Sequence, residues 1–317
     1  MAGRRCPGSC CHLSLLQLTG NDGCHKEEPM SSGPGRVLPW LIYPTVVTLS
    51  LALFALLQWA GVSLIISTYV PVLATAALVT ALESALPHRA DWRPPSGEVR
   101  TDLAFMVVVQ LAFPPLMGFL FTYALIRPAA ALDLPISGFW PHAWPIWIQA
   151  VLMVLVVDFL RYWLHRAAHQ NDTLWRLHSV HHSVEQLYWL NTARFHPLEK
   201  ALQMSLDSLP FLLMRVDARV LALYYLAYAT NGFFQHCNIK LHYGPLNYIV
   251  GSAETHRWHH SRLPRESNAN YGNTVIVWDV LFGTWYLPKE REVDQLGLQD
   301  PAFPKSFLRL MRAPFTR

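Results

Sequence analysis

Four long apolar stretches constrain this chain more than any other feature. A helix needs about 20 apolar residues to cross a hydrocarbon core roughly 30 Å thick. Residues 37–61 and 64–86 satisfy this with almost nothing between them, which predicts a helical hairpin. Residues 103–126 and 144–164 form two further stretches, and Pro114-Pro115 should kink the first of these. The fold class predicted is an all-α, integral membrane helical bundle.

A weaker pair of apolar segments follows, at residues 202–214 and 220–234, separated by the charged residues 215–219. Each segment is short for a full crossing. A re-entrant or interfacial hairpin and two membrane crossings are therefore equally compatible with this region.

Composition and charge agree with a membrane protein. Hydrophobic residues make up 52% of the chain and charged residues 15%, against about 25% charged in ordinary soluble domains. No basic stripe is interleaved with aromatic residues, so nucleic-acid binding has no support. Most of the 25 Lys and Arg fall on the side of the membrane that carries residues 1–36, 87–102 and the segment from His165 onward; the exceptions are Arg127, Arg215 and Arg219. The positive-inside rule makes that side cytoplasmic.

The first 36 residues are expected to be a disordered tail. They contain four of the five cysteines, which lie beside two histidines, so a zinc knot is the alternative, although the spacing matches no standard finger. The residues concerned are Cys6, Cys10, Cys11, His12, Cys24 and His25. Met30 is a candidate translation start, which would make residues 1–29 an upstream addition.

Histidines are concentrated in one part of the chain: 11 of the 15 lie between residues 165 and 260. They form an HxxxH pair, an HxxHH box and a second, distant HxxHH box, with one further histidine at His236. Residues three and four apart lie on one face of a helix, so each box aims two or three imidazoles in one direction. The box residues are His165, His169, His178, His181, His182, His256, His259 and His260.

The number of imidazoles narrows the kind of metal site. Imidazole suits iron, zinc, copper and nickel, so ligand type alone does not name the metal. A zinc site uses three or four protein ligands, whereas eight or more require two metals. Two metals held largely by imidazole at a membrane surface favour redox-active iron, in a histidine-lined di-metal cap on the cytoplasmic side. Isolated histidines such as His88 and His142 are expected to be ordinary interfacial residues.

The box spacing resembles that of the fatty acid hydroxylase and sterol desaturase superfamily. The second box begins only nine residues after the first ends, whereas acyl-CoA desaturases separate their first two boxes much more widely. Three further segments are similar to this family: residues 174–178 (LWRLH), 194–199 (RFHPLE), and the pair 270–272 and 278–284 (NYG and WDVLFGT). The likeness covers residues 145–290, so the expected organisation is a tail at 1–36, transmembrane helices at 37–144, a catalytic domain at 145–290 and a C-terminal tail at 291–317.

The resemblance implies roles for individual residues. The eight box histidines are expected to be iron ligands, and His236 resembles the additional family histidine that completes the cluster. His196 is left open as a ligand or a neighbour of ligands, and for His242 interfacial packing is preferred. Metal-bound imidazoles donate their other N–H to an oxygen. Candidates for the surrounding residues that orient the ligands are Asp158, Asn191 and Glu199, proposed as active-site residues, together with Arg194 and Asp279; the alternative for each is a structural salt bridge or helix cap.

The function implied is a membrane-bound, non-haem di-iron oxidoreductase that uses O₂ to hydroxylate or desaturate a lipid. The substrate could be a sterol, a fatty acyl chain or an alkylglycerol, because these reactions share one ligand set. The sequence shows no dinucleotide fingerprint, fused cytochrome b5-like segment or ferredoxin cysteine spacing, so an external electron donor of cytochrome b5, ferredoxin or reductase type is expected. The alternatives are a metal-dependent hydrolase or zinc-storage protein, and an inactive scaffold. The oligomeric state is open.

Overall fold

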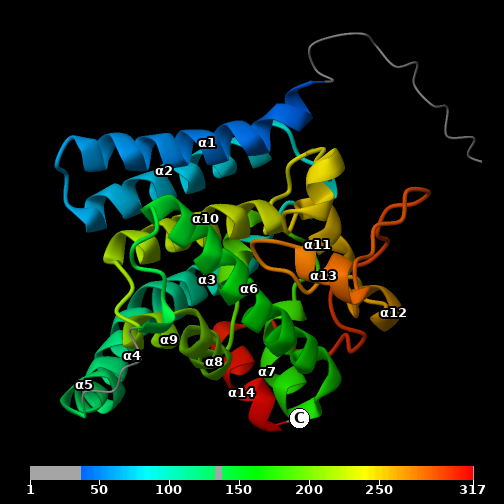
Figure 1. Cartoon of the computed structure of the whole chain (residues 1–317). Helices are drawn as coiled ribbons and strands as arrows, with labels where there is room; N and C mark the ends of the chain where they lie inside the picture. Colours follow the sequence, from blue (N-terminus) through cyan, green and yellow to red (C-terminus); the bar gives the residue numbers. More distant parts are fainter. Residues whose placement is uncertain (1–36, 133–137, 317) are drawn as a thin grey trace, which may run out of the picture. The chain divides into compact units, whose positions relative to one another are not determined.

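The first two apolar stretches fold into a packed pair of helices, α1 (Leu38–Trp59) and α2 (Leu64–Ala85), as predicted. Gly61 adopts φ +72° at the turn between them, a conformation that costs glycine little. The computed structural model describes residues 37–132 and 138–316, so the predictions for residues 1–36 lie outside the described residues. Figure 1 shows α1 and α2 lying side by side, with α10 next to them.

The third apolar stretch is one long helical segment from residue 96 to 131. It begins earlier than predicted and contains two π-helical parts, one of them at Met106–Ala112, directly before the proline pair. Proline has no N–H to donate, so Pro114 and Pro115 leave the carbonyls of Gln110 and Leu111 without their usual helical partners. The wider turn accommodates this loss, and the helix continues. Its parts are α3 (Ser96–Phe105), η3 (Met106–Ala112), α4 (Phe113–Phe121), η4 (Thr122–Ile126) and α5 (Arg127–Ala131).

The fourth stretch forms α6 (Ile146–Gln170), which extends past the predicted end at residue 164 and includes the first histidine pair. Four helices of the described residues are long and apolar enough to cross a membrane: α1, α2, the segment 96–131, and α6. Only 11% of the most apolar window of residues 96–131 is buried within the protein, so most of that surface is available to lipid. The weaker pair, folded as α8 (Pro197–Asp207), α9 (Leu209–Leu213) and α10 (Ala218–His236), is not among these four.

Helix α10 is the central element around which the others pack. It contacts α1 and α2 on one side and α6 on another. The core between α10 and the hairpin contains Phe54, Val79 and Leu226, and the core between α10 and α6 contains Met153 and Val220. These apolar contacts place the C-terminal end of α10, where His236 lies, beside the histidine boxes.

Short helices cover the end of the bundle that carries the histidines. They are η2 (Ala90–Trp92), α7 (Asp172–His182), η6 (Trp189–Ala193), η7 (Gly244–Tyr248), α11 (Ala253–His259), α12 (Pro264–Ser267), α13 (Val277–Phe282) and α14 (Phe307–Thr316). Extended pairing in the described part of the chain is limited to isolated bridges. The segment predicted as a C-terminal tail contains α14, which packs against α7 and α3 through the buried Leu310.

Candidate metal centre

The histidine boxes lie on three helices whose ends meet. His165 and His169 occupy the last turns of α6, and a single residue, Asn171, separates α6 from α7. The Asn171 side chain accepts hydrogen bonds from the backbone N–H groups of Thr173 and Leu174, which starts α7 immediately after the turn. The second HxxHH box lies on α11, whose first turn is capped by Ser252 through the N–H of Thr255.

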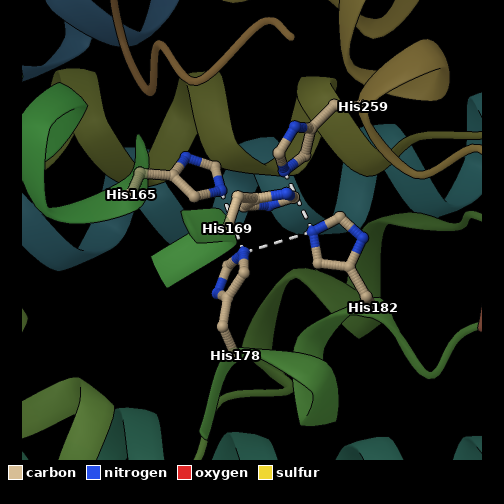
Figure 2. A group of neighbouring side chains, drawn as sticks. All are labelled: His165, His169, His178, His182 and His259. Atoms are coloured by element: carbon tan, nitrogen blue, oxygen red, sulfur yellow. Dashed lines mark hydrogen bonds between the residues drawn. The ribbon is translucent and has the colours of Figure 1, made fainter. Parts of the chain in front are cut away.

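The boxes divide between two groups of imidazoles. Within each group the ligand atoms all lie within 4.8 Å of one another. Group A, drawn in Figure 2 with its rings pointing toward one another, is His165, His169, His178, His182 and His259. Group B is His181, His236, His256 and His260. These nine residues are the nine predicted from sequence.

Each HxxHH box contributes to both groups, which the sequence did not indicate. In the first HxxHH box, on α7, His178 and His182 belong to group A and His181 belongs to group B. In the second box, on α11 and the residue after it, His256 and His260 belong to group B and His259 belongs to group A. Residues i and i+4 differ by about 40° around a helix axis, whereas i+3 lies about 60° to the other side of i. Two sites placed beside the helix therefore receive different histidines of such a box: one site receives two of them and the other site receives the third.

The Nε2 atoms of neighbouring imidazoles converge within each group. Those of His165 and His178 are 2.9 Å apart, and those of His182 and His259 are 3.0 Å apart. In group B, the Nε2 atoms of His236 and His256 are also 3.0 Å apart. Ligand nitrogens at right angles around one ion, with bonds of about 2.1 Å, have this separation.

The proton positions strengthen this argument. His165 Nδ1 lies 2.8 Å from the carbonyl oxygen of Tyr271, and a carbonyl can only accept, so Nδ1 carries the proton. His178 Nδ1 lies 2.7 Å from Glu199 Oε1 and donates in the same way. Their facing Nε2 atoms then both present lone pairs. Only a shared cation makes this favourable, so the residues fit a metal.

The imidazoles outside the membrane-spanning helices are held in the neutral form that a metal needs. Burial disfavours the charged ring and lowers the pKa of His256 to about 3. The same cause holds the pKa well below its ordinary value for His178, His181, His182, His259 and His260.

Family comparisons agree with the geometry. The sequence model of the fatty acid hydroxylase family matches residues 150–284. Ornithine lipid hydroxylase OlsE of Rhizobium tropici is 33% identical over 250 residues, which are 77% of this chain and 74% of that protein. The chain belongs to the fatty acid hydroxylase family.

More distant members of the fatty acid hydroxylase family share part of the chain. Alkylglycerol monooxygenase of Xenopus tropicalis is 34% identical over 54% of this chain, which corresponds to 35% of that protein. A probable Delta(7)-sterol 5(6)-desaturase of Neurospora crassa is 28% identical over 60% of this chain and 51% of that protein. No solved structure matches this chain. Together with its four long apolar helices, this membership identifies the protein as an integral membrane lipid hydroxylase of the oxidoreductase class.

Two of the polar residues predicted for the site of this family member bond directly to an imidazole. Glu199 accepts from His178, as given above, and Asn191 Oδ1 accepts from His236 Nδ1 at 2.8 Å. The orientation of the Asn191 amide is fixed because its Nδ2 donates to the carbonyl of Gln186 at 2.8 Å.

The side chains of the other three candidates bond no imidazole among the described residues. Two of them accept hydrogen bonds from backbone N–H groups, and the third contributes its own backbone carbonyl. Asp158 accepts from the N–H of Val275, and among the described residues it bonds no imidazole. Asp279 accepts from the N–H groups of Tyr271 and Gly272 at 2.8 and 2.7 Å, and so holds the loop whose carbonyl binds His165. Arg194 contributes its carbonyl to His181 Nδ1 at 3.3 Å.

Sequence reasoning missed the loop that follows α12. The Ala269 carbonyl accepts from His259 Nδ1 at 2.8 Å, and the Asn268 side chain lies 3.1 Å from His169 Nδ1. A backbone carbonyl has no signature in a sequence. The one available signal was the Asn270-Tyr-Gly motif, in which Asn270 has φ +57° and Gly272 lies too close to the Val275 carbonyl for a Cβ to fit.

The other histidines in the described part of this family member lie outside both groups. His196 caps α8, accepting from the N–H of Leu198 at 3.2 Å, and its Nε2 lies 3.2 Å from the Met311 carbonyl. His242 is 46% exposed and packs near the ring of Trp40, which agrees with the preferred interfacial position. His88 packs on Trp92.

A cavity of about 420 Å³ reaches the histidines from the helical bundle. His165, His178, His181, His236 and His256 are part of its lining. Much of the remaining wall is apolar and comes from α2 and from the segment 96–131, both of which expose apolar side chains on their outer faces. An acyl or sterol-like group inside the cavity would lie against imidazoles of both groups.

Proposed function

We propose that this protein is a di-iron, O₂-dependent enzyme that hydroxylates or desaturates a membrane lipid with electrons from an external donor. The observation that carries the proposal is the pair of imidazole groups with converging Nε2 atoms, in contact with an apolar cavity. Relatives named as a lipid hydroxylase, a monooxygenase and a sterol desaturase support the reaction class. We further propose that residues 145–290 are the catalytic unit, which the family match at 150–284 supports.

The nine histidines would hold two iron ions, one in each group. Iron bound there would supply the redox chemistry by which O₂ attacks an unactivated C–H bond. The protein contributes ligand geometry: Glu199 and Asn191 fix the tautomers of His178 and His236, and the carbonyls of Tyr271 and Ala269 fix those of His165 and His259. Glu199 and Asn191 are accordingly proposed as positioning residues.

The cavity walls position the lipid and exclude water from the ligands. Group B is buried throughout, whereas His165 and His169 of group A are only half-buried. We propose that the lipid enters sideways from the bilayer, and that the histidine side faces the cytoplasm, as the distribution of Lys and Arg suggests. An electron donor of cytochrome b5, ferredoxin or reductase type would then approach from the aqueous side.

Two measurements test the proposal. Purified protein should contain close to two iron ions per chain, and lipids from expressing cells grown under ¹⁸O₂ should contain one labelled oxygen in a hydroxylated product, or a new double bond without label. His181→Ala and His259→Ala should abolish the product, whereas His242→Ala, outside both groups, should retain it. Zinc in place of iron, together with an unchanged lipid profile, would contradict the proposal.

A further inference from the structure

The cavity beside the histidines is lined by three polar residues of α8, and only one of them, Glu199, bonds a histidine of the two groups. One side is apolar and includes Val72 and Leu73 of α2 and Leu111 of η3. The opposite side includes Glu199, Gln203 and Asp207 of α8. A pocket that received only hydrocarbon would have no use for this wall, because burying polar groups without partners costs free energy.

The three polar residues lie on one face of α8, at positions i, i+4 and i+8. Each is almost fully buried, with exposed fractions of 6%, 3% and 6% along the helix. The two outer residues have strong partners: Glu199 receives His178 Nδ1, and Asp207 Oδ2 receives the Arg161 guanidinium at 2.9 Å. Gln203 lies between them.

The orientation of the Gln203 amide is fixed by its neighbour. Its Nε2 donates to Glu199 Oε1 at 3.1 Å, and the reversed amide would bring two oxygens together. The Oε1 atom of Gln203 is therefore an acceptor, and it is buried with no hydrogen-bond partner among the described residues. The nearby Glu199 Oε2 is also buried and without a partner. Buried acceptors of this kind are normally satisfied, so a hydrogen-bond donor in the cavity would complete the bonding of Gln203.

We propose that Gln203 forms a subsite that accepts a hydrogen bond from a hydroxyl or amide N–H of the lipid substrate. The inference rests on the proposed function, since it names the class of lipid that the same cavity receives. The substrate is an amphiphile whose hydrogen-bond donor enters the cavity, as opposed to a hydrocarbon chain that enters alone.

The subsite also determines which end of the lipid is oxidised. One oxygen, Glu199 Oε1, bonds both His178 Nδ1 at 2.7 Å and Gln203 Nε2 at 3.1 Å. The donor group of the lipid is thus separated from a ligand of group A by a single side chain. The oxidised carbon lies a few bonds from the polar group, and the far end of the chain extends along the apolar wall.

Two probes that differ only in the donor test the subsite: hexadecan-1-ol and its methyl ether. Binding to the iron-loaded full chain in lipid nanodiscs is followed by tryptophan fluorescence, because Trp189 lines the cavity. The wild-type protein should bind the alcohol about tenfold more tightly than the ether, as expected for one buried hydrogen bond. Gln203→Met, which keeps the volume and removes the acceptor, should reduce that preference to less than twofold.

Ser205→Ala is the matched control, because Ser205 lies on α8 outside the cavity and bonds the Ala201 carbonyl. It should retain the tenfold preference. Equal binding of the two probes by the wild-type protein would overturn the subsite, even if Gln203→Met fails to fold. A preference that survives in Gln203→Met would also overturn it, because the acceptor for the alcohol would then be a group other than Gln203. Active, iron-containing protein with no preference refutes the subsite alone, whereas a clear preference without iron or product refutes the proposed function alone.

Discussion

Substitution of Asn191 by leucine should release one iron ion and leave the other in place. Among the histidines of the two groups, the Asn191 side chain bonds His236 alone, a member of group B. The two groups differ in how firmly their rings are held. In group A, four of the five histidines have an oxygen partner at Nδ1, from Tyr271, Asn268, Glu199 and Ala269. In group B, only two of the four histidines have an oxygen partner at Nδ1, from Arg194 and Asn191. The Nδ1 atoms of His256 and His260 are buried with no partner in the part of the chain described.

The magnitude follows from the bond that is lost. His236 and Asn191 are 2% and 1% exposed, so water cannot replace the amide oxygen. An unpaired buried donor costs about 1–3 kcal/mol, which corresponds to a factor of about 5–150 in a dissociation constant. Loss of such a partner typically weakens a metal site by about 10–100-fold. We expect the group B affinity to fall by that factor.

The assay is a chelator titration of the purified, iron-loaded chain, with iron per chain measured at each step. The wild-type protein should lose its two ions in two steps, the group B ion first. Asn191→Leu should lose that ion at about 10–100-fold less chelator, while the second step is unchanged. Asn191→Asp, which keeps an acceptor oxygen for His236, should lie between the two.

Release of both ions in one unshifted step would refute this reasoning, because the groups would then not be independent sites. A shift of the second step alone would mean that Asn191 supports the wrong group. Glu199→Leu provides the converse experiment, since Glu199 bonds His178 of group A.

Three further predictions concern the surroundings of the site. Burial lowers the pKa of His196 below its ordinary value, so the unfolded chain binds more protons below about pH 6.5; protonation of Nδ1 removes the acceptor for the N–H of Leu198, so amide exchange in the first turn of α8 should accelerate at pH 5 in wild type, and this pH effect should be absent in His196→Gln. Gly272→Ala would place a Cβ 2.5 Å from the Val275 carbonyl and shift the loop that holds His165, so its group A iron should be released at less chelator than in wild type. Arg194→Met leaves Asp102 buried without its cation and should cost about 3–5 kcal/mol, measurable as a loss of folded protein in a thermal melt.

Hydropathy and ligand type were sufficient to predict the helices and the histidines. Apolar runs of membrane length end where the polar loops begin, so α1 and α2 lie within two residues of their predicted limits. The end of α6 was placed too early because Arg161 and His165 look like the start of a polar loop, whereas the cavity and group A bury or half-bury these side chains inside the protein. The histidines were recognisable in the sequence because they are grouped in boxes whose three- and four-residue spacing places them on one side of a helix.

The division of the boxes and the role of the carbonyls could not be predicted. Which face of α7 meets which ion depends on how the helix is rotated about its axis, and packing against α6 and α14 determines that rotation. The carbonyls of Tyr271 and Ala269 are present in any sequence, and only the loop conformation aims them at His165 and His259. Asp158 was expected beside an imidazole because a buried carboxylate suggests a partner; its partner is the backbone of the same loop.

Each HxxHH box contributes histidines to both groups, and this arrangement has a consequence for how such proteins diversify. Since the boxes of α7 and α11 each contribute to both groups, the separation of the two groups is set by the angular spacing of residues around an α-helix, which loop changes do not alter. Cavity walls built from α2 and the segment 96–131, which contribute no histidine to either group, are therefore free to change without disturbing the paired groups. A new lipid can be accommodated by replacing side chains along these walls, while the oxidising machinery is inherited unchanged.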